Sequence, residues 1–393
     1  MAGESADDED ISIAVAHWHI RAWGGAEYLV TKLAEAVGDG RVYTLGEPDP
    51  DDANPYGDVE WVDVSAGPGA RVKRRIGRAA EYALWEDVDW RRHGDPDVLI
   101  TSGSTTRAVI TSDDTLHVNY CHSPPRWLYD LYHDRKGTLL GQLARPAVRY
   151  FRLRDSAVDP RVDRYLANSP IVARRIWKFY KREARVLSPP LDIEKYYDGG
   201  DDGFYLHLGR LDEEKGVQEI VQAFADDDRR LVLAGGEGDV GRETMRRIEG
   251  ASNIEYEGFV DDERKLSLLA TCRAVVFNGR NEDFGIVPVE ANASGKACLV
   301  PDEGFPSVLV DDGENGVIHD GTPEGIRACL RRFESEGVGS DVQSHAAPYS
   351  TETFEEGLRS AVQEWYDAFE TRVEDDLRAC EDEGRRPDAD PDV

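Results

Sequence analysis

Lysine is scarce in this chain of 393 residues: nine lysines stand beside 38 arginines, against 78 aspartates and glutamates, so the formal net charge is −31. A chain this acidic is not expected to bind nucleic acid, whose phosphates attract Lys and Arg. We interpret the many carboxylates and few lysines as adaptation to concentrated salt. In molar salt the Debye length is about 3 Å, so this charge would hardly repel a phosphate ligand. In dilute buffer it should destabilise the fold by self-repulsion.

Cysteine is also rare, and the five cysteines show neither CxxC nor CxH spacing. Neither a disulfide framework nor a zinc site is therefore expected, and a reducing compartment is predicted. The start lacks a basic segment followed by an apolar one, and no uninterrupted apolar run has the length needed to span a bilayer. We expect a cytoplasmic protein, at most peripheral on the inner face of the cell membrane.

Short apolar segments alternate with amphipathic helical patterns along most of the chain. This alternation predicts an α/β protein with two doubly wound parallel sheets, one in each domain. The predicted strands are Ile11–Ala16, Val42–Leu45, Val98–Thr101, Leu116–Tyr120 and Tyr165–Asn168, then a strand from Phe204, Arg230–Ala234, Asn253–Tyr256, Ala274–Asn278 and Ala297–Val300. The predicted organisation is a first domain at 11–190, a hinge at 191–203, a second domain at 204–350, a closing helix at 351–373, and disordered acidic ends at 1–10 and 374–393.

The segment from Glu282 to Glu290 places two carboxylates around a predicted helix start. It follows the predicted strand Ala274–Asn278, and Pro288 suits the first turn of a helix because its missing N–H needs no partner there. Free amides near Gly285 would make this start an anion site at the carboxyl edge of a parallel sheet, where open α/β folds bind ligands. The plainer interpretation is that Glu290 complements the helix dipole and Glu282 is solvated.

A second charged turn, from Gly209 to Gly216, follows the apolar strand that begins at Phe204. Arg210 offers a planar fork for phosphate oxygens, and Lys215 offers a mobile point charge. Alone this turn could equally be a solvated loop. Together with the two-glutamate segment it predicts a diphosphate site.

Two further features occur in the first half of the chain. Gly24 and Gly25 follow the first predicted strand, and their backbone lets a phosphate approach closely, although a simple strand-to-helix turn would also use them. His122 directly follows the predicted strand Leu116–Tyr120. Its position at a carboxyl end makes contact with a ligand as plausible as a purely structural role.

These motifs resemble family 4 of the retaining glycosyltransferases, which have the GT-B fold. The resemblance covers residues 11 to 345, and the Cys-His-Ser-Pro-Pro-Arg form is similar to a bacterial branch that transfers mannose from GDP-mannose to lipid-linked polysaccharide. The motifs that carry it are Gly24-Gly-Ala-Glu27, Tyr120-Cys-His-Ser-Pro-Pro-Arg126, Ala167-Asn-Ser169, Ser188-Pro-Pro-Leu-Asp192, Gly209-Arg210, Lys215-Gly216, Gly258-Phe-Val260 and Glu282 to Glu290.

The resemblance implies two Rossmann-like domains facing each other across a cleft, a nucleotide-diphosphate sugar donor, and a glycan or lipid-linked acceptor. It implies that Glu282 holds the transferred sugar, that His122 touches it, and that Glu290 holds the ribose hydroxyls. No metal or other cofactor is expected, because Arg210 and Lys215 would stabilise the departing diphosphate. The expected donor-binding residues are Gly24, Gly25, Arg210, Lys215, Val260, Phe284, Gly285, Ile286 and Glu290, and the expected catalytic residues are Glu282, His122, Arg210 and Lys215.

A basic region interrupts the acidic chain. Residues 145–185 contain twelve Lys and Arg against four Asp and Glu. A helix starting at Pro170 would carry cations along one stripe, suited to anionic lipid or to a lipid-linked diphosphate acceptor, although an ordinary solvated helix face is equally consistent. The residues proposed for this contact are Arg174, Arg175, Lys178, Lys181 and Arg182.

Two other functions remain open on the same residues. One is a nucleotide-sugar epimerase or hydrolase, which would need no acceptor. The other is a non-catalytic nucleotide-sugar-binding protein. Incubation of the donor with and without a polyprenyl-phosphate sugar would separate all three.

Overall fold

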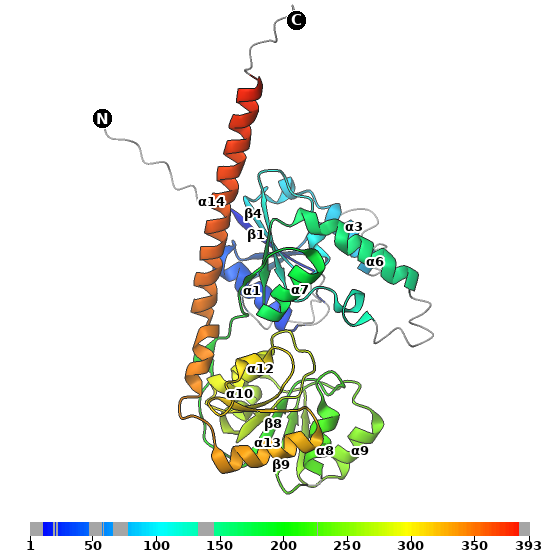
Figure 1. Cartoon of the computed structure of the whole chain (residues 1–393), viewed down its shortest axis with the longest axis vertical. Coiled ribbons are helices and arrows are strands. Elements are labelled where there is room, and N and C mark those ends of the chain that lie inside the picture. The colour runs from blue at the N-terminus through cyan, green and yellow to red at the C-terminus, as the bar shows by residue number, and fades with distance from the viewer. Residues whose placement is uncertain are drawn as a thin grey trace, which may run out of the picture. The chain divides into compact units, whose positions relative to one another are not determined.

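The computed structural model describes residues 11–18, 20, 23–46, 57, 59–65, 78–132, 145–225 and 227–384, with side chains described only as far as residue 373. Contacts divide the chain into two compact units, Met1–Leu187 with Glu355–Val393, and Ser188–Phe354. Each unit contains a parallel sheet with helices on both faces (Figure 1), so the predicted α/β class is confirmed. Of the predicted disordered ends, 1–10 and 374–393, the residues 1–10 and 385–393 lie outside the described residues.

The described part of the first unit has a seven-stranded parallel sheet in the order β3-β2-β1-β4-β5-β6-β7. Its strands are β1 Ile13–His17, β2 Arg41–Thr44, β3 Glu60–Asp63, β4 Val98–Ser102, β5 Leu116–Cys121, β6 Arg164–Ala167 and β7 Arg185–Val186. Its α-helices are α1 Gly25–Val37, α3 Arg78–Glu86, α6 Arg145–Val158, α7 Pro170–Tyr180 and most of α14 Thr351–Gly384. Every residue of β4 and β5 is buried, as helices on both faces of a parallel sheet require.

The second unit has a six-stranded parallel sheet in the order β10-β9-β8-β11-β12-β13. Its strands are β8 Phe204–Leu208, β9 Arg230–Ala234, β10 Ile254–Gly258, β11 Ala274–Val276, β12 Cys298–Pro301 and β13 Gly316–His319. Its α-helices are α8 Val217–Ala225, α9 Arg242–Gly250, α10 Asp262–Thr271, α11 Ile286–Ala293, α12 Pro306–Leu309 and α13 Pro323–Glu336.

Strand order reverses once in each sheet, and this places the loops that matter for function. In the first unit the reversal lies between β1 and β4, and in the second between β8 and β11. Both pairs are parallel and directly hydrogen-bonded, so the loops after the paired strands leave the sheet side by side. Such switch points are where open α/β sheets bind ligands.

Several helices begin at residues that cap their free amides. The Ser169 side chain accepts a hydrogen bond from the amide of Val172 at the start of α7, and Pro170 occupies the first helical position. Asp261 caps α10 in the same way, through the amide of Arg264. Each cap supplies an acceptor for an amide that has no partner within the helix.

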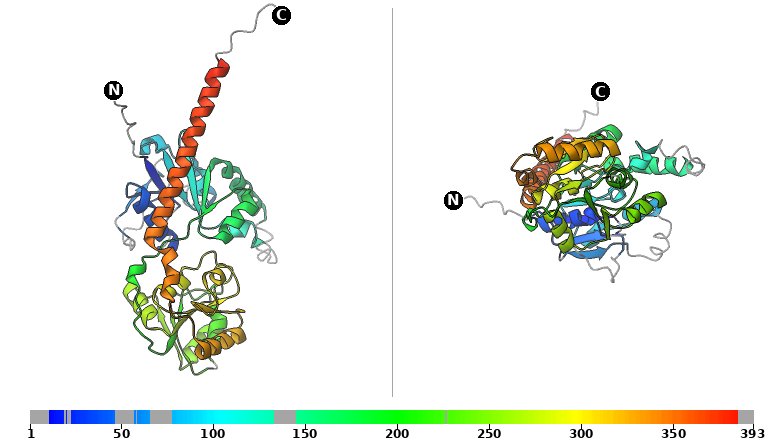
Figure 2. Two further views of the ribbon diagram at one scale, coloured as in Figure 1. Left: turned by 60° about the vertical axis from the view of Figure 1, so that its left-hand side comes forward. Right: turned by 90° about the horizontal axis from the view of Figure 1, so that it is seen from below.

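The structure differs from the predicted elements mainly at sheet edges and domain limits. Strands β3, β7 and β13 were not predicted, because they are two to four residues long and lie at or beside the edges. Helix α14 runs unbroken to Gly384, so 374–384 is helical rather than a disordered tail (Figures 1 and 2). The predicted hinge, 191–203, lies inside the second unit, where Lys296 bonds Asp198 and the carbonyl of Gly200.

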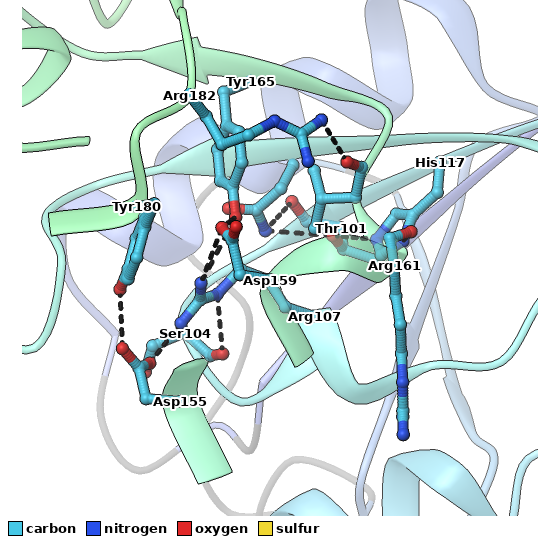
Figure 3. A network of polar contacts seen from close by, with 12 residues as sticks. Thr101, Ser104, Arg107, His117, Asp155, Asp159, Arg161, Tyr165, Tyr180 and Arg182 are labelled. Carbon is cyan, nitrogen blue, oxygen red and sulfur yellow. Dashed lines mark hydrogen bonds and ion pairs between the residues drawn. The ribbon is translucent and has the colours of Figure 1, made fainter. Parts of the chain in front are cut away.

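A buried ion pair holds the first unit together around the basic helices (Figure 3). The Arg107 guanidinium donates to the Asp155 carboxylate, and both side chains are almost fully buried. Tyr129 and Tyr180 donate to the other carboxylate oxygen at 2.6 and 2.9 Å. The pair therefore links the loop after β4 to α6, which carries Asp155, and to the end of α7, which carries Tyr180.

Candidate functional site

In the second unit the two predicted charged segments meet. The Nζ atom of Lys215 lies 2.6 Å from Oε2 of Glu282, and both side chains are about one quarter exposed. Lys215 follows β8 and Glu282 follows β11, so the pairing of these strands brings the two loops together although 67 residues separate them. The structure therefore assembles, at the switch point of the sheet, a cation and a carboxylate that the sequence places far apart.

Asn278 and Gly216 fasten these loops to each other. The buried Asn278 amide donates to the carbonyls of Gly216 and Gly321, both at 3.3 Å. Gly216 has φ +62°, and a Cβ at this position would lie 2.4 Å from the carbonyl oxygen of Asn278. Only glycine permits this approach, so the position of Lys215 depends on its neighbour having no side chain.

We expect Gly216→Ala to destabilise the second unit more than Gly203→Ala. Both glycines have positive φ, but a Cβ on Gly203 would have no neighbour within 4 Å. Gly203→Ala should cost only the left-handed backbone strain, about 1–2 kcal/mol, whereas Gly216→Ala adds the clash with Asn278. Urea unfolding of the two variants measures the difference, and equal losses would contradict the packing argument.

Arg210 lies on the same turn as Lys215 but is more open. Its guanidinium is 3.1 Å from the Asp212 carboxylate, and its side chain is 64% exposed. Asp212 also accepts a hydrogen bond from the Lys215 amide at 2.9 Å, so one carboxylate ties both cationic residues to the turn. An exposed guanidinium held only by a surface ion pair can reorient toward a ligand at little cost.

Glu290 is placed deeper than predicted. It lies in the second turn of α11, where it is buried; Tyr196 donates to its Oε1 at 2.8 Å, and Lys265 Nζ lies 3.3 Å from the same oxygen. Burial lowers the pKa of Lys265, but the charges of Glu290 and Asp262 outweigh it and raise the pKa above its usual value. The lysine thus stays charged beside the carboxylate and orients it.

The start of α11 has the free backbone amides on which the prediction of an anion site depends. Gly285 caps the helix with φ +83°, and within the described chain no acceptor bonds the amides of Gly285, Ile286 or Val287. The Phe284 side chain is buried against Phe305 and Tyr349. Only the backbone of Phe284 is therefore suited to meet a ligand.

At the edge of β10, Val260 is half-buried and packs on the sheet core, whereas the neighbouring Phe259 is 87% exposed. A ligand could therefore contact Val260 only through its backbone atoms.

In the first unit, His122 lies at the carboxyl end of β5 as predicted. Its Nε2 is 2.9 Å from the hydroxyl of Ser102, and its ring packs beside Trp18 and Tyr120. Burial, followed by the charge of His17, lowers the pKa of His122 to about 3. His122 is therefore a neutral imidazole at ordinary pH.

The fold does not require glycine at position 24 or 25. Gly24 has extended backbone with φ −157°, and a Cβ there would make only an ordinary contact with Glu27. A Cβ on Gly25 would meet no atom within 4 Å. Space beside Gly25 is consistent with a ligand approaching the backbone at the start of α1.

The basic helix α7 only partly matches its predicted face. Arg174, Lys178 and Lys181 are exposed. Arg182 instead donates to the carbonyls of Val162 and Asp163. This structural role removes Arg182 from the proposed contact surface.

Two residues within α7 itself also bear on the proposed contact surface. The Arg175 side chain is 12% exposed and contacts Ser123 and Asp130, so it too leaves the proposed surface. Trp177 differs from the buried Ile176 and Tyr180 of the same helix, because it is 57% exposed, with the Lys181 amine 4.6 Å from its ring centre.

Sequence reasoning missed several residues around these sites. His17 and Ser102 lie beneath His122, Asn278 joins the two loops, and Tyr196 and Lys265 hold Glu290. Each sits at or near a strand end or on a helix, with no local pattern to mark it. Their partners lie 25 to 94 residues away in the second unit and 20 to 85 away in the first.

In the part of the chain that the structure describes, no helix has the length and apolar character needed to cross a bilayer.

Comparisons with known proteins point to sugar transfer. Residues 192–353 match the family model of glycosyl transferases group 1. A D-inositol 3-phosphate glycosyltransferase from Corynebacterium glutamicum is 30% identical over 199 residues, covering 42% of this chain and 48% of the relative. The O-antigen chain mannosyltransferase C from Escherichia coli is 36% identical over 146 residues, covering 33% and 39%. The chain thus spans about half the length, or less, of these relatives.

Solved structures show the same fold. Sucrose-phosphate synthase from Thermosynechococcus elongatus has a TM-score of 0.71 at 17% identity, covering 91% of this chain and all of that one. HepE from Anabaena, solved with UDP and glucose, has a TM-score of 0.69 at 15% identity, covering 90% and 99%. The chain therefore has the GT-B fold of two Rossmann-like units, and the match to the glycosyl transferases group 1 model lies within its second unit.

Proposed function

We propose that this chain is a retaining glycosyltransferase that moves a hexose, with mannose the favoured sugar, from a nucleotide-diphosphate sugar to a glycan or lipid-linked acceptor. The observation that carries the proposal is the contact of Lys215 with Glu282 at the switch point of the second sheet. The matching group 1 domain spans both residues. Neighbours solved with UDP, glucose or UDP-glucose support a nucleotide sugar as the ligand.

Lys215 and Arg210 would bind the donor diphosphate together with the free amides at the start of α11. In the transfer step the bond from the anomeric carbon to the diphosphate oxygen breaks, and its electron pair leaves with the diphosphate. The acceptor hydroxyl forms the new bond on the same face and gives its proton to the departing phosphate oxygen. The two cations stabilise the charge that develops on the diphosphate, so no metal is proposed.

The carboxylates would fix the rest of the donor. Glu290, oriented by Tyr196 and Lys265, would accept hydrogen bonds from the ribose hydroxyls, and Glu282 would hold the transferred sugar. His122 would contact the same sugar. A buried carboxylate already held by two donors loses little further entropy on binding, which favours recognition of a diol.

Donor binding and transfer test this function directly. We expect UDP-glucose or GDP-mannose to raise the melting temperature in molar KCl, because a ligand that binds only the native state stabilises it. Incubation with a polyprenyl-phosphate sugar should then yield a longer glycan. Free sugar or an epimer from the donor alone would favour the hydrolase or epimerase, and binding without any product would favour the non-catalytic protein.

The acceptor side is proposed to lie on the outer faces of α6 and α7. The exposed face of α6 carries Arg149, Tyr150 and Leu153, and that of α7 carries Trp177 and Lys178. Figure 1 shows α6 at the rim of the first unit, on the side away from α14. Exposed aromatic and aliphatic groups beside cations are typical of surfaces that rest on anionic lipid.

We expect Trp177→Ala to lower binding to vesicles of anionic lipid about fivefold, because withdrawing a half-exposed ring from the interface costs about 1 kcal/mol. Flotation in molar salt suits the measurement, since it screens the net negative charge. Tyr197→Ala is the matched control, because Tyr197 is 52% exposed but lies in the second unit. Equal binding of both variants and the wild type would refute the lipid contact.

A further inference from the structure

Beneath His122 a buried chain of polar groups runs from helix α1 to the end of β5. The Ser102 hydroxyl lies 2.9 Å from Nε2 of His122 and 3.0 Å from Nδ1 of His17. Nε2 of His17, on the other side of that ring, lies 3.5 Å from the Glu27 carboxylate. His17 and Ser102 are fully buried and Glu27 nearly so. His17 and Ser102 end the adjacent strands β1 and β4, and Glu27 lies in the first turn of α1.

Glu27 determines which groups donate and which accept along this series of polar side chains. Its carboxylate lies at the positive end of α1, which favours the ionised form. Burial raises the pKa of Glu27, but the neighbouring His17 side chain and the backbone amide of Glu27 outweigh this and lower the pKa below its usual value. Nε2 of His17 is buried and makes no hydrogen bond in the described chain, and the Glu27 carboxylate, 3.5 Å away, is the charged group beside it. A carboxylate only accepts, so the proton of His17 belongs on Nε2.

The remaining protons follow by elimination. Burial lowers the pKa of His17, so the ring is neutral and its Nδ1 must accept. The single hydroxyl proton of Ser102 is then donated to His17. The oxygen of Ser102 can only accept from His122, which therefore carries its proton on Nε2. Nδ1 of His122 is left as a lone-pair acceptor, and no described group bonds it.

The ring of His122 is also held in orientation. Trp18 lies beside it with ring centres 5.7 Å apart, and Tyr120 with centres 5.5 Å apart. Gly103 makes room for Trp18, because a Cβ there would lie 2.3 Å from the Trp18 ring. A neutral imidazole of fixed tautomer and fixed plane can recognise one hydroxyl.

We propose that Glu27, through His17 and Ser102, is a positioning residue that makes His122 present Nδ1 as a hydrogen-bond acceptor to a hydroxyl of the transferred sugar. The inference rests on the proposed function for the identity of that hydroxyl, whereas the proton assignment depends only on the buried contacts and on the charge states of Glu27 and His17. With the opposite tautomer, Nδ1 of His122 would donate a hydrogen bond, and the oxygen of the sugar hydroxyl would have to accept it.

The first test needs no substrate. In protein labelled with ¹⁵N at histidine, two-bond proton–nitrogen spectra distinguish the two neutral tautomers, and His122→Ala identifies the signal. We expect wild-type His122 to be protonated at Nε2. Glu27→Gln keeps the shape but can donate to His17, so it should convert His122 wholly or partly to the Nδ1–H form. Wild-type protonation at Nδ1, or an unchanged tautomer in Glu27→Gln, overturns the inference.

The second test concerns sugar recognition. With UDP-glucose and GDP-mannose as probes, Glu27→Gln should lower kcat/KM for transfer about tenfold, the value of one hydrogen bond, while the affinity for UDP or GDP stays unchanged. Glu35→Gln is the matched control, because it makes the same change on the same helix at a carboxylate paired with Lys32. An equal loss of nucleotide affinity would indicate a merely structural role. Absence of transfer by the wild type would refute the proposed function and leave the tautomer result standing.

Discussion

Replacing Lys215 by methionine is expected to lower sugar transfer by about 10²-fold or more, the usual effect of removing one charged contact to a transition state. The methionine keeps the apolar stem that packs beside Gly209, so the turn should remain folded. In the free protein the Lys215 amine is held by Glu282 at 2.6 Å in a partly exposed pair. Because such a pair contributes little net free energy, the amine can move to a diphosphate at small cost.

The chain offers a closely matched control for this experiment. Lys32 pairs with Glu35 at the same distance of 2.6 Å, with side chains 19% and 34% exposed, against 25% for both members of the Lys215–Glu282 pair. Lys32→Met therefore removes a similar ion pair from the first unit and should leave transfer near the wild-type rate. Turnover of both variants at the wild-type rate, with saturating donor in molar salt, would defeat the assignment of Lys215 to the diphosphate.

Asp155→Ala is expected to destabilise the first unit by about 3–5 kcal/mol, because the buried Arg107 guanidinium loses its hydrogen-bonded counter-charge and keeps only the more distant Asp159 carboxylate at 3.8 Å. The Arg107 side chain is 1% exposed and bonds Asp155, the hydroxyl of Tyr165 and the carbonyl of Ser104. Tyr180 and Tyr129 would lose their acceptor as well. Burial and the charge of Asp155 raise the pKa of the Tyr129 hydroxyl, so it stays a donor over the whole working range of pH.

Denaturant unfolding, followed separately for the two units, measures this loss, and the transition of the second unit serves as the internal reference. Asp89→Ala is the control, since Asp89 pairs with Arg91 at a surface where the Arg91 side chain is 79% exposed, and such pairs contribute little to stability. A double change of Arg107 and Asp155 to leucine should recover part of the loss, because it removes the unpaired guanidinium, although Asp159 loses its cation. A loss from Asp155→Ala no larger than that from Asp89→Ala would mean that the pair is not buried in solution.

The charged residues of the second unit could be predicted from the sequence because a local pattern marks their positions. Lys215 and Glu282 each follow an apolar segment and precede a helical pattern, and this succession marks the carboxyl end of a buried strand. Helix α11 begins within one residue of the predicted position, with Pro288 in its first turn. Glu290 was placed only approximately, because its burial depends on Tyr196 and on Lys265 from α10.

The face of α7 shows where a local pattern fails. Charge and sequence spacing do not distinguish the basic side chains of this region, Arg174, Arg175, Lys178 and Arg182. Arg182 nevertheless bonds two carbonyls near the start of β6, and Arg175 reaches Asp130. Helical periodicity says which residues share a stripe, but whether a cation meets water or a carbonyl depends on segments far along the chain.

By itself the sequence determined the α/β class, most of the central strands, the start of α11 and the charged turns that follow β8 and β11, because burial and helix starts leave marks within a few neighbouring residues. Tertiary structure alone decided that β8 lies beside β11, so that Lys215 meets Glu282, and that β1 lies beside β4, so that His17 meets Ser102. It also decided the pairing of Arg107 with Asp155. Each of these contacts depends on strand order and helix docking, and those follow from the free energy of the whole folded unit rather than from any local stretch of residues.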